Sequence, residues 1–161
     1  MKKITAAILG LGIGLSSLSH AAGYAVIDLE KVVENSTYLK QQNASLEQSV
    51  KPQATKLEQL AKDIESIRQK GQEKGANVQQ LQTQYQAKAS EYQSIQQGVQ
   101  SKMQASLQAM NRSFEAKVKQ AAEQLRQENN LDFVLNKNAA IAYDKKNDLT
   151  DKMIQKVNAL K

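Results

Sequence analysis

One long helical pattern in the second half of the chain limits its fold more than any other feature. Apolar residues recur every three or four positions from Val78 to Leu125, with Lys88 as one polar interruption. We expect one helix from about Asn77 to Glu128, which at a rise of ~1.5 Å per residue is roughly 78 Å long. A compact domain of this chain length has a radius of gyration of only ~14 Å, so the helix must project from a smaller body.

A second helical pattern precedes the first and predicts its partner. After Leu46 its apolar residues are spaced as in a heptad seam, with Gln53 as one polar interruption. The pattern stops at the glycine-containing residues 71–77, which we interpret as a turn between two antiparallel helices. The predicted seam residues of this first helix are Leu39, Leu46, Val50, Leu57, Leu60, Ile64 and Ile67.

The returning helix changes its period near Val99. Before that residue the spacing is heptad-like, and beyond it the apolar positions repeat every eleven residues, which is typical of a nearly straight helix. Four soft or aromatic side chains on this helix resemble those of promiscuous binding surfaces, but their helical spacing favours the seam between the two helices. These four residues are Tyr85, Tyr92, Met103 and Met110.

Pro52 lies inside the outgoing helical pattern. A proline there removes one backbone hydrogen bond and crowds the preceding turn, at a cost of about 3 kcal/mol. We therefore predict a kink or a helix restart at Lys51 and Pro52, and we interpret Pro52 as a candidate hinge of the hairpin.

The two ends of the chain predict a small β-containing body. A strand is expected at residues 23–29, and two more at 131–135 and 139–143, joined as a β-hairpin. A last helix is expected to begin at residues 148–151, where Asp148 can cap it. So few residues rarely make a stable core alone, so we expect oligomerisation through the apolar strands.

These patterns together predict an α+β fold that is mostly α. The predicted body comprises residues 22–38 and 129–161, and the helical-hairpin arm comprises residues 39–128 with its tip near 71–77.

Residues 1–21 have the pattern of a secretory signal peptide. Lys2 and Lys3 precede an apolar run at residues 4–18, and small residues precede a cleavage site after Ala21. The apolar run is shorter than the roughly 18 residues that a membrane-spanning helix requires. We expect a soluble, secreted chain of residues 22–161.

The composition of that mature chain argues against most enzyme chemistry. The full chain has no Cys or Trp, and its one His, His20, lies in the leader, so the mature chain has none of the three. An imidazole base, a cysteine nucleophile and the usual zinc ligands are therefore missing, and no glycine-rich loop is suited to phosphate. We expect no enzyme activity, cofactor or metal. Removal of Lys2 and Lys3 leaves 20 basic residues against 16 acidic ones, a net charge of +4, which we interpret as a solvated helix surface and not as a nucleic-acid site.

The layout resembles the Skp (OmpH-like) family of periplasmic chaperones over the whole chain. The most specific features are Leu-Asp-Phe-Val-Leu at 131–135, Ala-Ile-Ala-Tyr at 140–143 and Asp-Leu-Thr at 148–150. The resemblance implies a jellyfish-like homotrimer whose body is a β-structure shared between subunits. It also implies an ATP-independent, cofactor-free holdase that keeps unfolded outer-membrane β-barrel proteins from aggregating and aids their delivery to outer-membrane assembly.

Basic residues gather near the predicted tip. Arg68, Lys70, Lys74 and Lys88 face only Glu73 between positions 66 and 88, a net charge of +3. This charge could steer acidic clients toward the arm, or it could be an ordinary solvated tip.

One feature of the family does not carry over. A basic lipopolysaccharide-binding cluster has been proposed for the returning arm, but residues 96–108 have Lys102 as their single charge, and residues 79–108 contain eleven glutamines. We expect at most a weak peripheral contact with anionic lipid or lipopolysaccharide. The main alternative function is a structural or tethering coiled-coil protein of the cell envelope; an enzyme and a nucleic-acid binder are less consistent with the composition.

Overall fold

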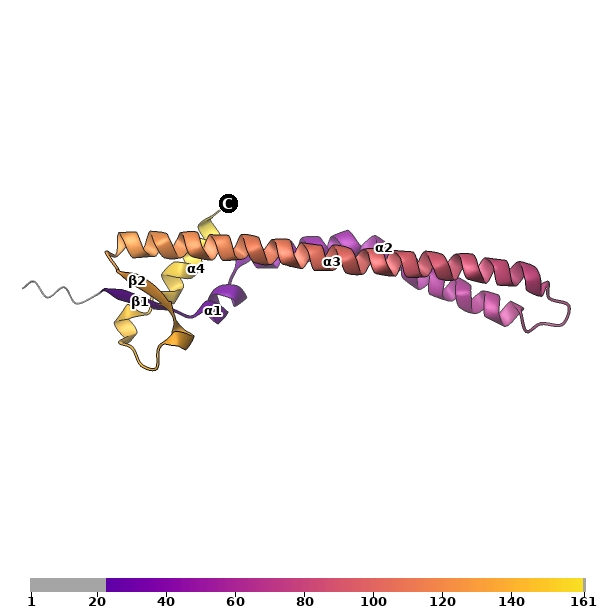
Figure 1. Ribbon diagram of the computed structural model, residues 1–161, viewed down its shortest axis with the longest axis horizontal. Helices are drawn as coiled ribbons and strands as arrows, with labels where there is room; N and C mark the ends of the chain where they lie inside the picture. Colours follow the sequence, from indigo (N-terminus) through magenta and orange to yellow (C-terminus); the bar gives the residue numbers. More distant parts are fainter. Residues whose placement is uncertain (1–22, 161) are drawn as a thin grey trace, which may run out of the picture.

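The computed structural model describes residues 23–160; the predicted signal peptide lies outside these residues. Two long helices form a hairpin that extends from a small base at the two ends of the chain (Figure 1). Two short 3-10 turns, η1 (Lys137–Ala139) and η2 (Lys145–Asn147), lie between the last strand and the last helix. The strands and α-helices are β1 (Tyr24–Ile27), α1 (Leu29–Glu34), α2 (Thr37–Lys70), α3 (Val78–Glu128), β2 (Phe133–Asn136) and α4 (Thr150–Ala159).

The helical hairpin begins and ends at side-chain caps. The Ser36 side chain accepts from the backbone N–H of Leu39 at the start of α2, and the Asn77 side chain accepts from Gln80 at the start of α3. In the loop between the helices, Gly75 has a φ of 86°, a conformation that glycine adopts readily. The observed bounds of α3 confirm the predicted long helix.

The seam between α2 and α3 contains the predicted residues of α2, all of which are buried or half-buried. On α3, Tyr92 and Met110 are half-buried as predicted, but Met103 is 41% exposed and Tyr85 39% exposed. The prediction for Met103 is wrong because α3 presents a different face at this level. Ser106 is half-buried there, and Lys102 reaches across to α2, which leaves Leu107 41% exposed as well.

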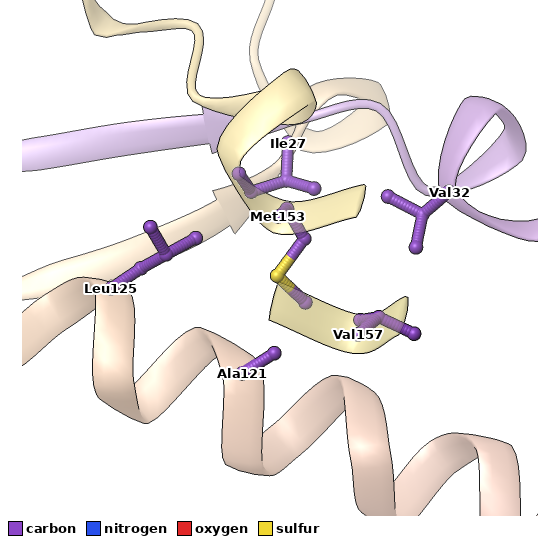
Figure 2. Packing of buried hydrophobic residues seen from close by; sticks show 6 residues of the cluster. All are labelled: Ile27, Val32, Ala121, Leu125, Met153 and Val157. Carbon is purple, nitrogen blue, oxygen red and sulfur yellow. The ribbon is translucent and has the colours of Figure 1, made fainter. Parts of the chain in front are cut away.

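The core of the base joins both ends of the chain to the last turns of α3. Figure 2 shows Met153 of α4 between Ile27 of β1 and Ala121 of α3. Burying a large apolar side chain completely contributes about 1.5–3 kcal/mol, so the larger members of this cluster stabilise the base. The six core residues are Ile27, Val32, Ala121, Leu125, Met153 and Val157. Ala121 and Leu125 lie within residues 39–128, the predicted arm, although they pack in the core of the base. The division of the chain into body and arm stays a prediction.

The strands form a parallel pair, in which Tyr24 lies opposite Phe133 and Ile27 opposite Asn136. The strands predicted at 23–29 and 131–135 are thereby confirmed. The rings of Tyr24 and Phe133 stack with their centroids 6.2 Å apart. Thr150 ties α4 to this pair, because its hydroxyl accepts from the backbone N–H of Asp28 at 2.9 Å.

The predicted strand at 139–143, and with it the antiparallel β-hairpin, is wrong. Immediately after β2, the side chain of Asn136 accepts from the N–H of Asn138 and closes a turn. The Lys137 ammonium then lies 3.0 Å from the Asp28 carboxylate, which holds the chain beside the start of α1. Within the described chain, residues 140–143 have no strand partner, and Ile141 is fully exposed.

Candidate functional site

The four basic residues predicted at the tip do not form one group. Arg68 and Lys70 lie in the last turn of α2 and Lys74 lies in the loop. Lys88 instead lies farther along α3, with its Nζ 2.8 Å from an oxygen of Asp63 on α2. This hydrogen bond raises the pKa of Lys88 and is the largest of the causes that lower the pKa of Asp63. Lys88 therefore joins the two helices, while the other three cations remain at the tip.

A second ion pair joins the helices on the side of Lys88 that is nearer the base. The ammonium of Lys56 lies 3.0 Å from the carboxylate of Glu91, and both side chains are about half exposed. Exposed ion pairs of this kind contribute about 0.2–1 kcal/mol each to stability. Their main effect is therefore on which residues of α2 and α3 lie opposite each other.

The tip of the hairpin contains an open cleft of about 370 Å³ with both apolar and polar lining residues. α2 and α3 separate toward the loop in Figure 1, and the cleft lies where they part. Val78 is 62% exposed and Tyr85 39% exposed, although the sequence pattern placed both in the seam. Gly71 was the one sequence signal for this opening, because it places no side chain between the helix ends. The lining residues are Ile67, Arg68, Gly71, Gln72, Val78, Leu81, Gln82 and Tyr85.

The surroundings of Pro52 differ from the prediction. α2 runs through Pro52 without interruption, so the alternative of a helix restart is wrong, and the hinge stays a prediction. In the turn that precedes the proline, the carbonyl oxygen of Ser49 accepts a hydrogen bond of 2.9 Å from the Lys102 ammonium on α3. A polar gap between the helices, lined by Ser49 and Ser106 among others, lies at the same level. Beside its proline the hairpin is therefore joined by a polar contact as well as by the half-buried Val50 of the seam.

The base exposes a separate set of apolar side chains. Phe133 is 41% exposed on β2, Val33 is 47% exposed on α1, and Ile141 is fully exposed in the segment between η1 and η2. Single exposed apolar residues are common on soluble proteins, and these three lie on different segments of one small base whose sheet has only two strands.

A metal site and a membrane-spanning helix both place requirements on the side chains of residues 23–160. Among residues 23–160, no group of three or more His, Cys, Asp or Glu side chains is placed to hold a metal ion. Across the same residues, none of the helices combines the length and the apolar character needed to cross a membrane.

The family of the chain follows from a match over almost its full length. The family model described as outer membrane protein (OmpH-like) matches residues 23–157. The chain belongs to the OmpH-like family. This membership confirms the resemblance drawn from the strand sequences, and it supports a chaperone role for the chain, in a family that is generally non-enzymatic.

A solved structure supports the fold of this OmpH-like chain. A protein of Caulobacter crescentus CB15, named as a proposed OmpH-like outer membrane chaperone, shares 19% sequence identity with a TM-score of 0.56. The alignment covers 86% of this chain and 85% of that one. The mostly helical α+β fold with long helices and a small sheet is thereby confirmed. None of the curated proteins compared with the chain matches it.

Proposed function

We propose that this OmpH-like chain is an ATP-independent periplasmic holdase that binds unfolded outer-membrane β-barrel proteins. The observation that carries the proposal is a long hairpin with exposed apolar residues along it, extending from a small base (Figure 1). Such an arm offers extended contact to a chain that has no fixed shape. In this role it keeps its clients from aggregating and aids their delivery to outer-membrane assembly, and no catalytic step or cofactor is required.

The middle of α3 supports the part of the proposal that concerns client contact. Met103 and Leu107 are each 41% exposed one helical turn apart, and the surrounding residues 96–108 carry Lys102 as their single charge. Methionine adapts to many apolar partners, and unfolded barrel strands alternate apolar and polar residues. Weak contacts of this kind let a client move along the arm and remain unfolded.

The base supports the homotrimeric part of the proposal. Its core contains six fully buried apolar residues, and it exposes Phe133, Val33 and Ile141. Burial of these side chains between copies of the chain would add apolar area to a base that has little of its own. Three arms acting on one client then bind by avidity, so that each contact can be weak.

The tip supports electrostatic steering by three of the four predicted residues. Arg68, Lys70 and Lys74 stand against Glu73 in the region of the loop, while Lys88 is paired with Asp63. A positive tip raises the rate at which acidic clients are captured, and this effect falls with ionic strength. The same charge allows a weak contact with anionic lipid, whereas Lys102 on α3 is hydrogen-bonded to Ser49.

The holdase is tested by dilution of a urea-unfolded outer-membrane barrel protein into buffer that contains residues 22–161 and no ATP. Light scattering reports aggregation, and native mass spectrometry reports the composition of the complex. We expect suppressed scattering and three copies of the chain per client. A double variant, Met103→Gln with Leu107→Gln, should suppress scattering less well than Gln104→Ala with Gln108→Ala on the same helix. Unchanged scattering with a folded, oligomeric wild type would instead favour a structural tether of the envelope.

A further inference from the structure

Apolar side chains of both helices face an opening at the tip of the hairpin. Ile67 of α2 and Leu81 of α3 are the last seam residues before the loop, and both line the cleft together with Tyr85. Val78, in the first turn of α3, lines it as well and is 62% exposed. Four apolar side chains are thus arranged around a space that the chain itself leaves unfilled.

Gly71 lines this cleft, although its backbone conformation does not require glycine. It has φ −69° and ψ −13°, which any residue adopts, whereas Gly75 in the same loop has a φ of 86°. A Cβ at Gly71 would meet its nearest atoms at 3.5 and 3.6 Å, which is ordinary van der Waals contact. The turn therefore does not require glycine at position 71, and because Gly71 lines the cleft, we expect a long side chain there to narrow it.

The rim of the cleft is positively charged. The guanidinium of Arg68 lines it, and the carboxylate of Glu65 is 4.0 Å away, so this pair is long and solvent-exposed. Lys70 and Lys74 lie in the adjoining turn and loop, and Glu73 is the single acidic residue between positions 66 and 85. With Glu65 included, residues 65–85 have a net charge of +1, and Arg68 lies beside the four apolar side chains of the cleft. Its complement is an apolar side chain with a carboxylate beside it.

We propose that the tip cleft binds one large apolar side chain of an extended, unfolded segment, with a neighbouring carboxylate of that segment on Arg68. The proposal rests on the proposed holdase function and specifies the peptide chemistry that the tip recognises. The volume of the cleft is at the lower end of the range of small-ligand pockets and is large enough for an aromatic ring. Apolar contact supplies the affinity, and the guanidinium supplies the preference for acidic segments.

Fluorescence anisotropy of a short labelled peptide tests the cleft directly. The probe alternates Phe and Ser and carries Asp beside one Phe; a second peptide has Asn in place of Asp, and a third has Ser in place of each Phe. The blocking variant is Gly71→Leu, and its matched control is Gly98→Leu, because a Cβ at Gly98 on α3 meets no atom within 4 Å. The charge variant is Arg68→Gln, and its control is Arg112→Gln on α3.

Binding of the acidic Phe peptide should weaken about tenfold or more in Gly71→Leu, since the leucine takes the place of a buried apolar group. Gly98→Leu should bind as the wild type does. Arg68→Gln should bind the Asp and Asn peptides equally, and Arg112→Gln should retain the preference for Asp. Equal binding by Gly71→Leu and the wild type, or equal binding of the Ser and Phe peptides, would overturn the proposal.

A membrane surface is the competing occupant, and vesicles of phosphatidylcholine with phosphatidylglycerol distinguish it. If Gly71→Leu weakens vesicle binding but not peptide binding, the cleft serves lipid and the proposal is wrong. The holdase function is read separately, from the scattering of a diluted barrel protein. Gly71→Leu should still suppress that scattering, because the rest of each arm remains. Failure of the wild type in the scattering assay, with peptide binding intact, would contradict the holdase function and leave the cleft assignment standing.

Discussion

Lys102 and Pro52 are predicted to be energetically coupled through the turn of α2 that precedes the proline. The missing N–H of Pro52 leaves the carbonyl of Gln48 without its helical donor, and Lys102 donates to the carbonyl of Ser49, the next residue, at 2.9 Å. We expect Lys102→Met to lower the free energy of unfolding by about 0.5–1.5 kcal/mol, the range for a single hydrogen bond. The loss should be smaller in a Pro52→Ala background, where the turn regains a regular geometry and the Ser49 carbonyl is turned less toward Lys102.

Urea unfolding of the two single variants and the double variant measures this coupling. Lys40→Met, on the same helix, is the control for removal of a lysine charge. An equal loss from Lys102→Met in both backgrounds would mean that the contact is independent of the proline.

We expect the stability of the folded protein to depend on pH through Glu123, which lies near the end of α3. Its carboxylate accepts from Arg126 at 2.7 and 2.9 Å and from Gln127 at 2.8 Å, and the Arg126 bond is the main reason that the pKa of Glu123 is lowered to about 2. Because the folded pKa lies below the ordinary value of 4.5, the stabilisation is complete above pH 4.5 and is lost as the pH falls toward about 2.

Thermal unfolding followed by circular dichroism tests this prediction in Glu123→Gln. The variant should melt below the wild type at neutral pH, and the difference should shrink between pH 4.5 and about 2. Glu47→Gln on α2 is the control. A difference between Glu123→Gln and the wild type that does not change with pH would contradict the assignment.

At the scale of elements, we expect α2 to bend at Pro52, so that the half of the helix after the proline moves relative to the half before it. Spin labels at Lys40→Cys and Glu73→Cys span the proline, and the chain has no cysteine of its own. We expect Pro52→Ala to narrow the distance distribution between them, because a complete hydrogen-bond ladder stiffens the helix. A label pair at Ala54→Cys and Glu73→Cys lies on one side of the proline and should not change. An unchanged distribution for the spanning pair would exclude the hinge.

The helices could be predicted from the sequence because their period repeats over many turns. Leu60 and Leu125 are completely buried, as their spacing indicated. Met103 was mispredicted because the apolar period continues through a level where Lys102 and Ser106 face α2. A count of apolar positions does not register a hydrogen bond to a backbone carbonyl near a proline.

The strands could be predicted only in part, because short elements depend on partners that are distant in sequence. Residues 131–135 contain a strand that pairs with β1, across more than a hundred residues. Residues 139–143 have equally good strand composition, yet the Asn136 turn and the Lys137–Asp28 ion pair direct the chain elsewhere. The cleft at the tip was also not predicted, since its sequence signal is the missing side chain of Gly71.

At the scale of the whole molecule, the hairpin is suited to contact with clients and the base to association between copies of the chain. The hairpin has a narrow apolar seam, polar flanks and scattered exposed apolar residues, which favours weak and extended contact. The base has a small dense core and exposes Phe133, Val33 and Ile141 at the end of the molecule opposite the tip. Association through the base would leave every arm free, whereas association through the arms would cover the surface proposed for clients.

The oligomer is therefore predicted to depend on Ile141. Its side chain is fully exposed, so Ile141→Asp should leave the fold of the base intact. If Ile141 lies between subunits, burial of the new carboxylate should weaken association by more than about a hundredfold. Sedimentation equilibrium should then show a single chain where the wild type shows three.

The matched control is Val78→Asp, which places the same charge on an exposed apolar residue at the tip, 62% exposed, and should leave the mass unchanged. The monomeric variant should also suppress the aggregation of a diluted barrel protein poorly, because one arm lacks the avidity of three. An Ile141→Asp protein that keeps the wild-type mass would place the subunit contact elsewhere. A monomer that still suppresses aggregation as well as the wild type would show that one arm is enough.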